Sequence, residues 1–123
     1  MPRKRYVTAH LAQCDRPAWR PLQLAVGEDL MWPWMWMCEL RTTSGVAIHA
    51  YKHHSTRRYL HLGPDADALQ YIGDHRYERV ELVDALEDAL CPWWEDLDAT
   101  PEDTVACWMA IERARRLAGR PVS

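Results

Sequence analysis

The chain has 123 residues, 48% of them hydrophobic, and a formal net charge of −3. This length suits one domain and is too short for two ordinary ones, and the apolar content excludes a disordered chain. The longest apolar run, residues 31–38, contains a proline and is far shorter than the roughly 20 residues of a membrane-spanning helix. We therefore expect a single folded domain without a membrane span.

The N-terminus and the cysteines indicate the compartment. Residues 1–14 are basic but lack the apolar core of a secretion signal, so a cytoplasmic protein is expected. Cys14, Cys38, Cys91 and Cys107 are widely spaced and form no C-x-x-C pair. In a reducing compartment they are expected to be free thiols, and the spacing of a zinc knuckle is absent. No cofactor is expected.

Residues 1–30 show no clear periodicity and are expected to form an irregular N-terminal segment. Residues 6–11 fit either a strand or a short helix, and residues 22–26 alternate as a short strand would. Two prolines, Pro17 and Pro21, mark irregular chain, because a residue that precedes proline is disfavoured in the helical region.

Residues 31–73 carry the alternation of a β-meander. Apolar side chains recur at every second position over residues 34–40, and residues 43–45 read as a three-residue hairpin loop that ends in glycine. The alternation continues over residues 46–50 and resumes at 60–62 after a second turn. Residues 68–72 are a possible fourth strand. We expect three or four antiparallel strands.

The chain then changes to a helical period. Over residues 77–90 the side chains of Val80, Val83 and Leu86 recur on one helical face. A second helix is expected to begin at Thr100, because threonine caps helices and the proline and acids that follow suit a first turn. With both helices within residues 77–118, the expected fold is α+β: an antiparallel three- to four-stranded β-meander followed by two helices packed on one face.

The register of the strands decides which side chains share a face. Keeping the apolar residues together pairs Leu40 with Ile48 across the first turn. The same criterion pairs Ile48 with Leu62 and Ala50 with Leu60 across the second turn. The remaining side chains then form a polar and aromatic face, which antiparallel sheets often leave to solvent.

On that face the register aligns Glu39, His49 and His61 in one row across three strands. One carboxylate and two imidazoles form a ligand set found in zinc hydrolases and non-haem iron oxygenases. A metal-dependent enzyme is therefore one alternative. The chain has no G-x-S-x-G, no P-loop and no G-x-G-x-x-G, so catalysis is the less favoured expectation.

The same face suggests a second alternative, the binding of single-stranded nucleic acid. The side chains that would carry it are Tyr51, Lys52, Arg57, Arg58 and Tyr59. Aromatic rings stack on bases and cations attract phosphates. The strongly acidic block that follows in the chain counts against this alternative, since it repels phosphate.

The leading hypothesis is a non-catalytic protein-protein interaction or regulatory module. Residues 65–103 hold thirteen acidic residues and two arginines, a net −11, which favours a basic protein partner. Tryptophan is a preferred interface anchor. The expected contact residues are Asp84, Glu87, Asp88, Trp93, Trp94 and Glu95. A small accessory or inhibitor protein of a mobile element would have this profile.

Overall fold

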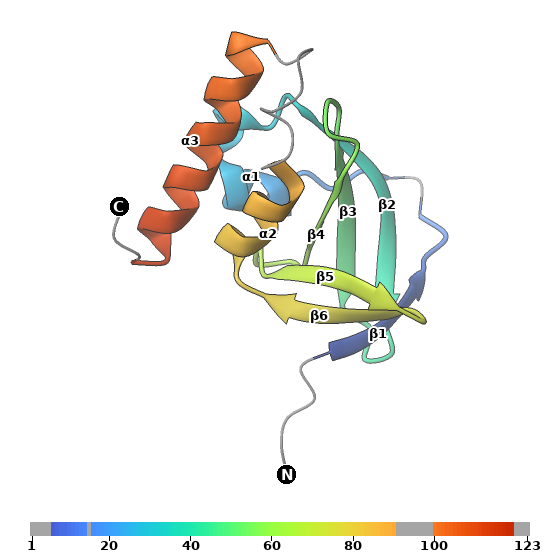
Figure 1. The fold of residues 1–123 in the computed structure, drawn as a ribbon. Helices are drawn as coiled ribbons and strands as arrows, with labels where there is room; N and C mark the ends of the chain where they lie inside the picture. The colour runs from blue at the N-terminus through green and yellow to red at the C-terminus, as the bar shows by residue number, and fades with distance from the viewer. Residues whose placement is uncertain (1–5, 15, 91–99, 120–123) are drawn as a thin grey trace.

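The structure is a computed structural model that describes residues 6–14, 16–90 and 100–119. The described ranges contain ten elements, and Figure 1 shows how the helices and strands are arranged. In chain order they are β1 (Tyr6–Leu11), α1 (Arg20–Val26), the short 3-10 helix η1 (Glu28–Leu30), β2 (Trp34–Thr42), β3 (Ala47–His53), β4 (Tyr59–Leu62), β5 (Ala68–Gly73), β6 (Arg76–Val80), α2 (Leu82–Leu90) and α3 (Pro101–Leu117).

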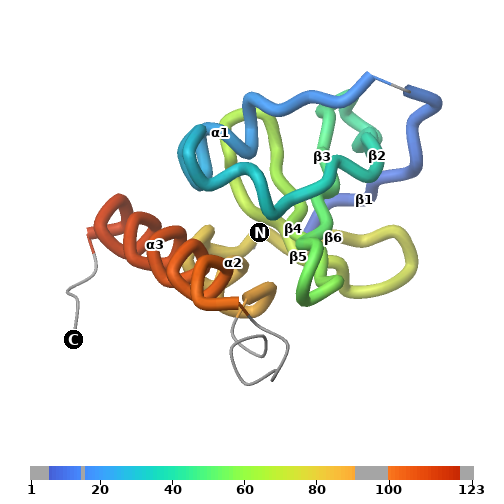
Figure 2. The backbone as a smooth tube through the Cα atoms, turned by 90° about the horizontal axis from the view of Figure 1, so that it is seen from above, coloured from blue at the N-terminus to red at the C-terminus, as the bar shows by residue number. Residues whose placement is uncertain are grey.

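The six strands form a closed antiparallel barrel in which each strand pairs with its neighbour in the chain and β6 pairs with β1. The helices gather on one side of this barrel (Figures 1 and 2). The predicted α+β class is confirmed. The predicted sheet of three or four strands is wrong, because two further strands close it. No helix in the described ranges is long and apolar enough to cross a membrane.

The two strands that were not predicted are β1 and β6, the first and last strands of the barrel in chain order. Residues 77–80, predicted as the start of a helix, belong to β6, and α2 begins only at Leu82. The helical period was misleading because Val80, at the end of β6, and Val83, in the first turn of α2, pack in the same apolar cluster. Their spacing of three residues therefore resembles one helical face although they belong to different elements. The expected irregular segment instead contains β1, which bridges β2 and β6.

The predicted strand over residues 22–26 is also wrong, since these residues lie in helix α1. Pro21 stands in its first turn, where a missing N–H matters little. Leu22, Ala25 and Val26 are buried, which is the i, i+3, i+4 spacing of one helical face. In so short a segment an alternating pattern and a helical pattern share most positions.

The register is as predicted at the first hairpin, where Leu40 pairs with Ile48. At the second hairpin it is shifted by one residue, so that Leu62 pairs with His49 and Leu60 pairs with Tyr51. Burial explains the error. Apolar alternation selects a register only when one face of the strand is buried, and β3 is buried on both faces.

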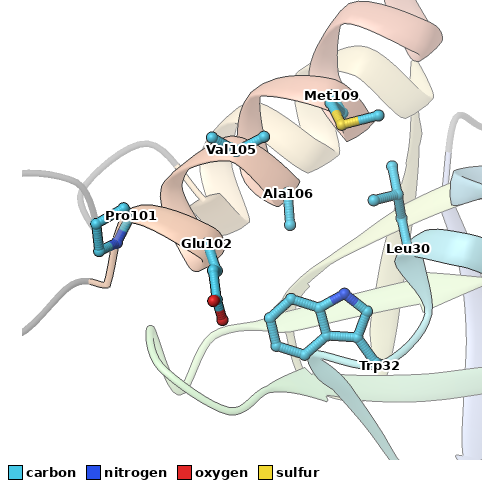
Figure 3. A pocket seen from close by; sticks show the side chains of 7 residues that line it. All are labelled: Leu30, Trp32, Pro101, Glu102, Val105, Ala106 and Met109. Atoms are coloured by element: carbon cyan, nitrogen blue, oxygen red, sulfur yellow. The ribbon is translucent and has the colours of Figure 1, made fainter.

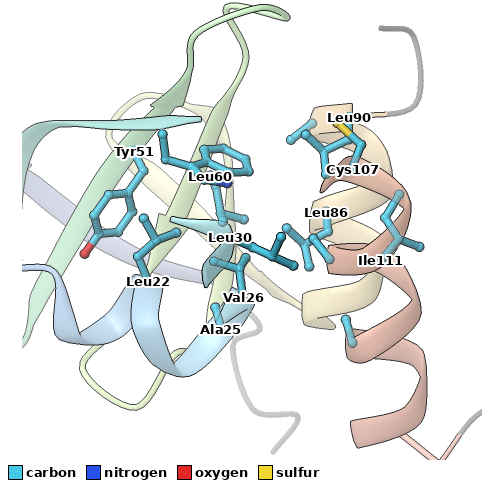
Figure 4. Close-up of a cluster of buried hydrophobic side chains, with 14 of the residues drawn as sticks. Leu22, Ala25, Val26, Leu30, Tyr51, Leu60, Leu86, Leu90, Cys107 and Ile111 are labelled. Atoms are coloured by element: carbon cyan, nitrogen blue, oxygen red, sulfur yellow. The ribbon is translucent and has the colours of Figure 1, made fainter. Parts of the chain in front are cut away.

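Two apolar clusters account for this double burial. The inner cluster fills the barrel and contains Ala9, Leu40, Ile48, Ala50, Leu69 and Tyr77. The outer cluster lies between the barrel wall and the helices, and Figure 4 shows Tyr51, Leu60, Leu22, Leu86 and Ile111 meeting there. The sheet face that was expected to be open to solvent is therefore largely covered.

Candidate functional site

Glu39 and His49 are directly paired across β2 and β3, as predicted, but both are buried. The indole Nε1 of Trp36 donates a hydrogen bond to His49 Nδ1 at 3.1 Å. A neutral His49 ring therefore carries its proton on Nε2, which lies 3.8 Å from a Glu39 oxygen. Burial lowers the pKa of His49, while Glu39 opposes this effect and Arg41 adds to it. The pair is part of a satisfied polar network beneath the surface.

His61 lies on the opposite side of the sheet from His49, so the predicted metal row is wrong. It pairs with Ala50 and Leu69, both of which belong to the inner cluster. Burial lowers the pKa of His61 to about 4. Within the described ranges, no three His, Cys, Asp or Glu side chains are grouped so that they could hold a metal ion.

A cysteine and a histidine meet where the β3–β4 hairpin contacts α3. His53 Nδ1 accepts hydrogen bonds from the backbone N–H groups of Ser55 and Thr56, both at 3.2 Å. The ring proton therefore belongs on Nε2, which lies 4.0 Å from Cys107 Sγ. An imidazole with this proton placement cannot take the thiol proton. His53 thus orders the hairpin through Nδ1 and places Nε2 beside the Cys107 thiol of α3.

The two tyrosines of the nucleic-acid hypothesis face opposite sides of the barrel wall. Tyr51 is fully buried, donates its hydroxyl proton to the Ala18 carbonyl at 2.5 Å, and has a pKa that burial raises to about 12. It cannot stack on a base. Tyr59 is 45% exposed and carries the Lys52 ammonium 5.8 Å from its ring centroid. Arg57 is exposed in the intervening turn.

The acidic side chains of α2 are partly neutralised within the chain. Arg115 donates to Glu87 through Nη2 at 2.6 Å and Nε at 3.2 Å. Asp88 accepts a hydrogen bond from the Gln70 amide at 3.3 Å, and its other oxygen lies 4.0 Å from Arg58. These contacts reduce the charge that α2 presents to a basic partner.

The other predicted contact residues are Asp84, Trp93, Trp94 and Glu95. Asp84 is exposed on α2. Trp93, Trp94 and Glu95 lie outside the described residues. The proposed surface on α2 and residues 93–95 therefore stays a prediction.

A groove that sequence reasoning missed runs along the N-terminal half of α3 (Figure 3). It has a volume of ≈ 550 Å³ and is lined by Leu30, Trp32, Pro101, Glu102, Val105, Ala106 and Met109. Trp32 is 55% exposed and Val105 is 56% exposed, high values for such apolar side chains. One signal was present in the sequence, because Val105 and Met109 are apolar, four residues apart, and off the face of α3 that carries the buried residues Ala106, Ala110 and Ile111.

The wall of the groove that contains Leu30 and Trp32 is fixed to α3 at two places. Arg113 forms two hydrogen bonds with Asp29 of η1, at 2.7 and 2.8 Å, just before the groove residue Leu30. Trp32 packs edge-on against His54 with ring centroids 5.8 Å apart, and His54 Nε2 lies 3.3 Å from Asp103. The ion pair of Arg113 with Asp29 and the contacts of His54 with Trp32 and Asp103 thus fix the positions of the two walls.

The groove has one acid on its rim. Glu102 is exposed, and Figure 3 shows its carboxylate on the Trp32 side of α3. No hydrogen bond or ion pair joins it to another residue of the described ranges. Its charge is therefore available to a partner.

Comparison with protein-family models, curated proteins and solved structures finds no match to this chain. The function is therefore inferred from the geometry and chemistry of the chain's own surfaces.

Proposed function

We propose that this protein is a non-catalytic binding module whose groove along α3 receives an amphipathic helix of a basic protein partner. The groove carries the proposal: an apolar hollow of ≈ 550 Å³ with Trp32 and Val105 each more than half exposed. Contiguous exposed apolar surface of this kind marks interaction sites in folded proteins, and tryptophan is enriched among the residues that dominate binding energy.

The spacing of the exposed residues on α3 favours a helix as the occupant. Pro101, Val105 and Met109 follow one another at four-residue intervals and form a ridge along the groove. Ridges of this spacing pack into the grooves of a second helix. The ridge rises about 12 Å over eight residues, which matches two turns of a partner helix with anchors at i, i+3, i+4 and i+7.

The charge of the rim favours a basic occupant. Glu102 lies beside the apolar floor without a partner among the described residues, and a lysine or arginine of the incoming helix would pair with it. The net −11 over residues 65–103 adds a longer-range attraction for a cationic partner.

The fixed walls support tight binding. The contacts of Arg113 with Asp29 and of His54 with Asp103 hold the groove before a partner arrives. Less conformational entropy is then lost on association, and more of the contact free energy contributes to affinity.

A selection from displayed peptides tests the proposal. Random peptides of about 16 residues, some four helical turns, are selected for binding to the whole chain, with Val105→Asp as the counter-selection. Recovered peptides are expected to carry apolar anchors at helical spacing and at least one lysine or arginine. In fluorescence anisotropy, Val105→Asp and Glu102→Lys should each weaken their binding by about tenfold or more, at least 1.4 kcal/mol.

Val46→Asp is the matched control. Val46 is 44% exposed and lies in the turn between β2 and β3, away from the groove. This variant should bind the selected peptides as the unmodified chain does. Peptides that lack the helical spacing, or that bind the Val105→Asp and Val46→Asp variants equally well, would contradict the proposal.

A further inference from the structure

The barrel wall opens between β4 and β5. These strands pair only at His61 with Leu69 and at Leu62 with Ala68. Beyond that point β4 stays with β3 and β5 stays with β6, and Figure 1 shows β4 and β5 running apart. A cleft of ≈ 280 Å³ occupies the opening, separate in its lining residues from the groove along α3.

Aromatic rings line this cleft from both strands. Tyr59 comes from β4 and Tyr71 from β5, and they are 45% and 48% exposed. His61 also belongs to β4, and its ring centroid lies 5.8 Å from that of Tyr59 and 5.2 Å from that of Tyr77. Burial keeps this imidazole neutral near pH 7. The cleft thus offers uncharged planar surfaces on which another aromatic ring can stack.

The charges around the aromatic rings favour an anion. The Lys52 ammonium lies over Tyr59, and the Arg58 guanidinium lines the cleft and donates to the Asp88 carbonyl at 3.1 Å. The acid in the lining, Asp88, already accepts a hydrogen bond from Gln70. A cationic ligand would meet two cations at this point, whereas a phosphate would meet two donors.

The polar side chains of the cleft suit the edge of a heteroaromatic ring. Gln70 supplies an amide with both donor and acceptor atoms, and neutral His61 supplies one of each. A planar ligand that stacks on tyrosine can therefore be hydrogen-bonded along its edge. A ring that combines such an edge with an attached anion is a nucleotide.

We propose that the cleft between β4 and β5 binds one nucleotide unit of single-stranded nucleic acid, with the base on Tyr59 and Tyr71 and the phosphate on Lys52 and Arg58. This site is independent of the groove proposed for the protein partner. It retains three of the five residues implicated by the sequence pattern, namely Lys52, Arg58 and Tyr59. Tyr71 takes the place of the buried Tyr51, and Arg57 has no assigned contact.

Fluorescence anisotropy with labelled oligo-dT and oligo-rU at low salt tests the site on the whole chain. Tyr71→Ala and Tyr59→Ala should each weaken binding at least about fivefold, the lower end of what one stacked base contributes, while Tyr71→Phe should retain it. Lys52→Ala should reduce the slope of log affinity against log salt by about 0.7. Trp32→Ala, an exposed aromatic residue of the other groove, is the control and should leave binding unchanged.

Asp88→Asn tests whether the ligand of the cleft is an anion or a cation. Removing this negative charge should tighten oligonucleotide binding, because the phosphate no longer meets a carboxylate. The proposal is overturned if the unmodified chain does not bind either oligonucleotide, if Tyr71→Ala binds as well as Tyr71→Phe, or if a tyrosine-containing acidic peptide competes more strongly than the oligonucleotides. The groove variant Val105→Asp should bind oligonucleotides normally, so failure here leaves the partner-helix proposal standing.

Discussion

Arg113 of α3 holds Asp29 of η1 with two hydrogen bonds of 2.7 and 2.8 Å across 84 residues of chain. The same guanidinium donates to the Val26 carbonyl at the end of α1 at 3.2 Å. Gly27, which follows, has φ 88°, and a Cβ built there would lie 2.7 Å from Arg113 Nη1. One arginine thus fixes the turn from α1 into η1, and with it the wall of the groove that ends in Trp32.

Gly27→Ala is expected to destabilise the protein by more than its backbone conformation alone requires. Gly27 has φ 88° and ψ 149°, a backbone conformation essentially restricted to glycine that costs another residue about 1–3 kcal/mol. The new Cβ would also displace Arg113 from Asp29. Gly45→Ala is the control for a positive φ without a steric contact, since Gly45 also has φ 88° but no heavy atom within 4 Å of its built Cβ. Urea unfolding should show a larger loss for Gly27→Ala than for Gly45→Ala.

The contribution of Arg113 is isolated by introducing both glycine substitutions into an Arg113→Ala background. If the displacement of Arg113 contributes to the excess loss, the difference between the two glycine variants should become smaller in that background. An excess that persists undiminished without Arg113 would assign the effect to the backbone of Gly27 and not to the clamp.

Stability is expected to fall between pH 6.5 and pH 4 because of His53. This side chain is 1% exposed, and burial, with a smaller contribution from His54, lowers its pKa from 6.5 to about 4. The unfolded chain therefore binds a proton in this range that the folded chain excludes, so the contribution is complete above pH 6.5 and is lost as the pH falls towards 4. The shift corresponds to roughly 3 kcal/mol.

His53→Asn tests this origin, because an amide oxygen can accept the backbone N–H bonds that Nδ1 accepts from Ser55 and Thr56. Urea unfolding measured across the range should show a weaker pH dependence for the variant than for the unmodified chain. An equal dependence would place the effect on other buried histidines, His61 and His49, whose pKa values burial also lowers.

Local signals in the sequence were sufficient at the start of α3 and at the first hairpin, although they failed for α1, where residues 22–26 were expected to form a strand. Thr100 caps α3 as predicted: its Oγ1 accepts the backbone N–H of Asp103 at 3.2 Å and donates to the Asp103 carboxylate at 2.7 Å. The first hairpin has the predicted pairing of Leu40 with Ile48, because a short glycine turn sets the register of the strands it joins.

The other features that were missed depend on contacts between residues distant in sequence. Closure of the barrel needs β1 beside β6, and no short pattern in residues 6–11 reports a partner about seventy residues away. The slip at the second hairpin follows from double burial, since Tyr51 and Leu60 pair in the outer cluster while Ala50 pairs with His61 on the inner side. A one-residue slip moves His61 away from His49 and removes the predicted ligand row.

Both candidate binding surfaces arise from the same non-local geometry. The groove joins Trp32 to Val105 across α3, and the cleft joins Tyr59 to Tyr71 where two strands separate. Neither pair has a diagnostic spacing in the sequence. The residue types were suggestive, as tryptophan, tyrosine and lysine recur at binding sites, but only the fold brings them together.

Trp36→Phe is expected to raise the pKa of His49. In the unmodified chain the indole N–H occupies His49 Nδ1, so a second proton on the ring would set two donors against each other. Phenylalanine removes the indole donor and leaves Nδ1 free to take up a proton, while Glu39, with an oxygen 3.8 Å from Nε2, favours the charged ring. Burial continues to oppose the charge, so the pKa should rise without fully regaining its ordinary value.

Histidine ring signals followed by NMR across a pH titration measure the change directly, and His61, which lies on the opposite face of the wall, serves as the internal control. An unchanged His49 titration in Trp36→Phe would show that burial alone sets the protonation of this residue and that the indole contact has no part in it.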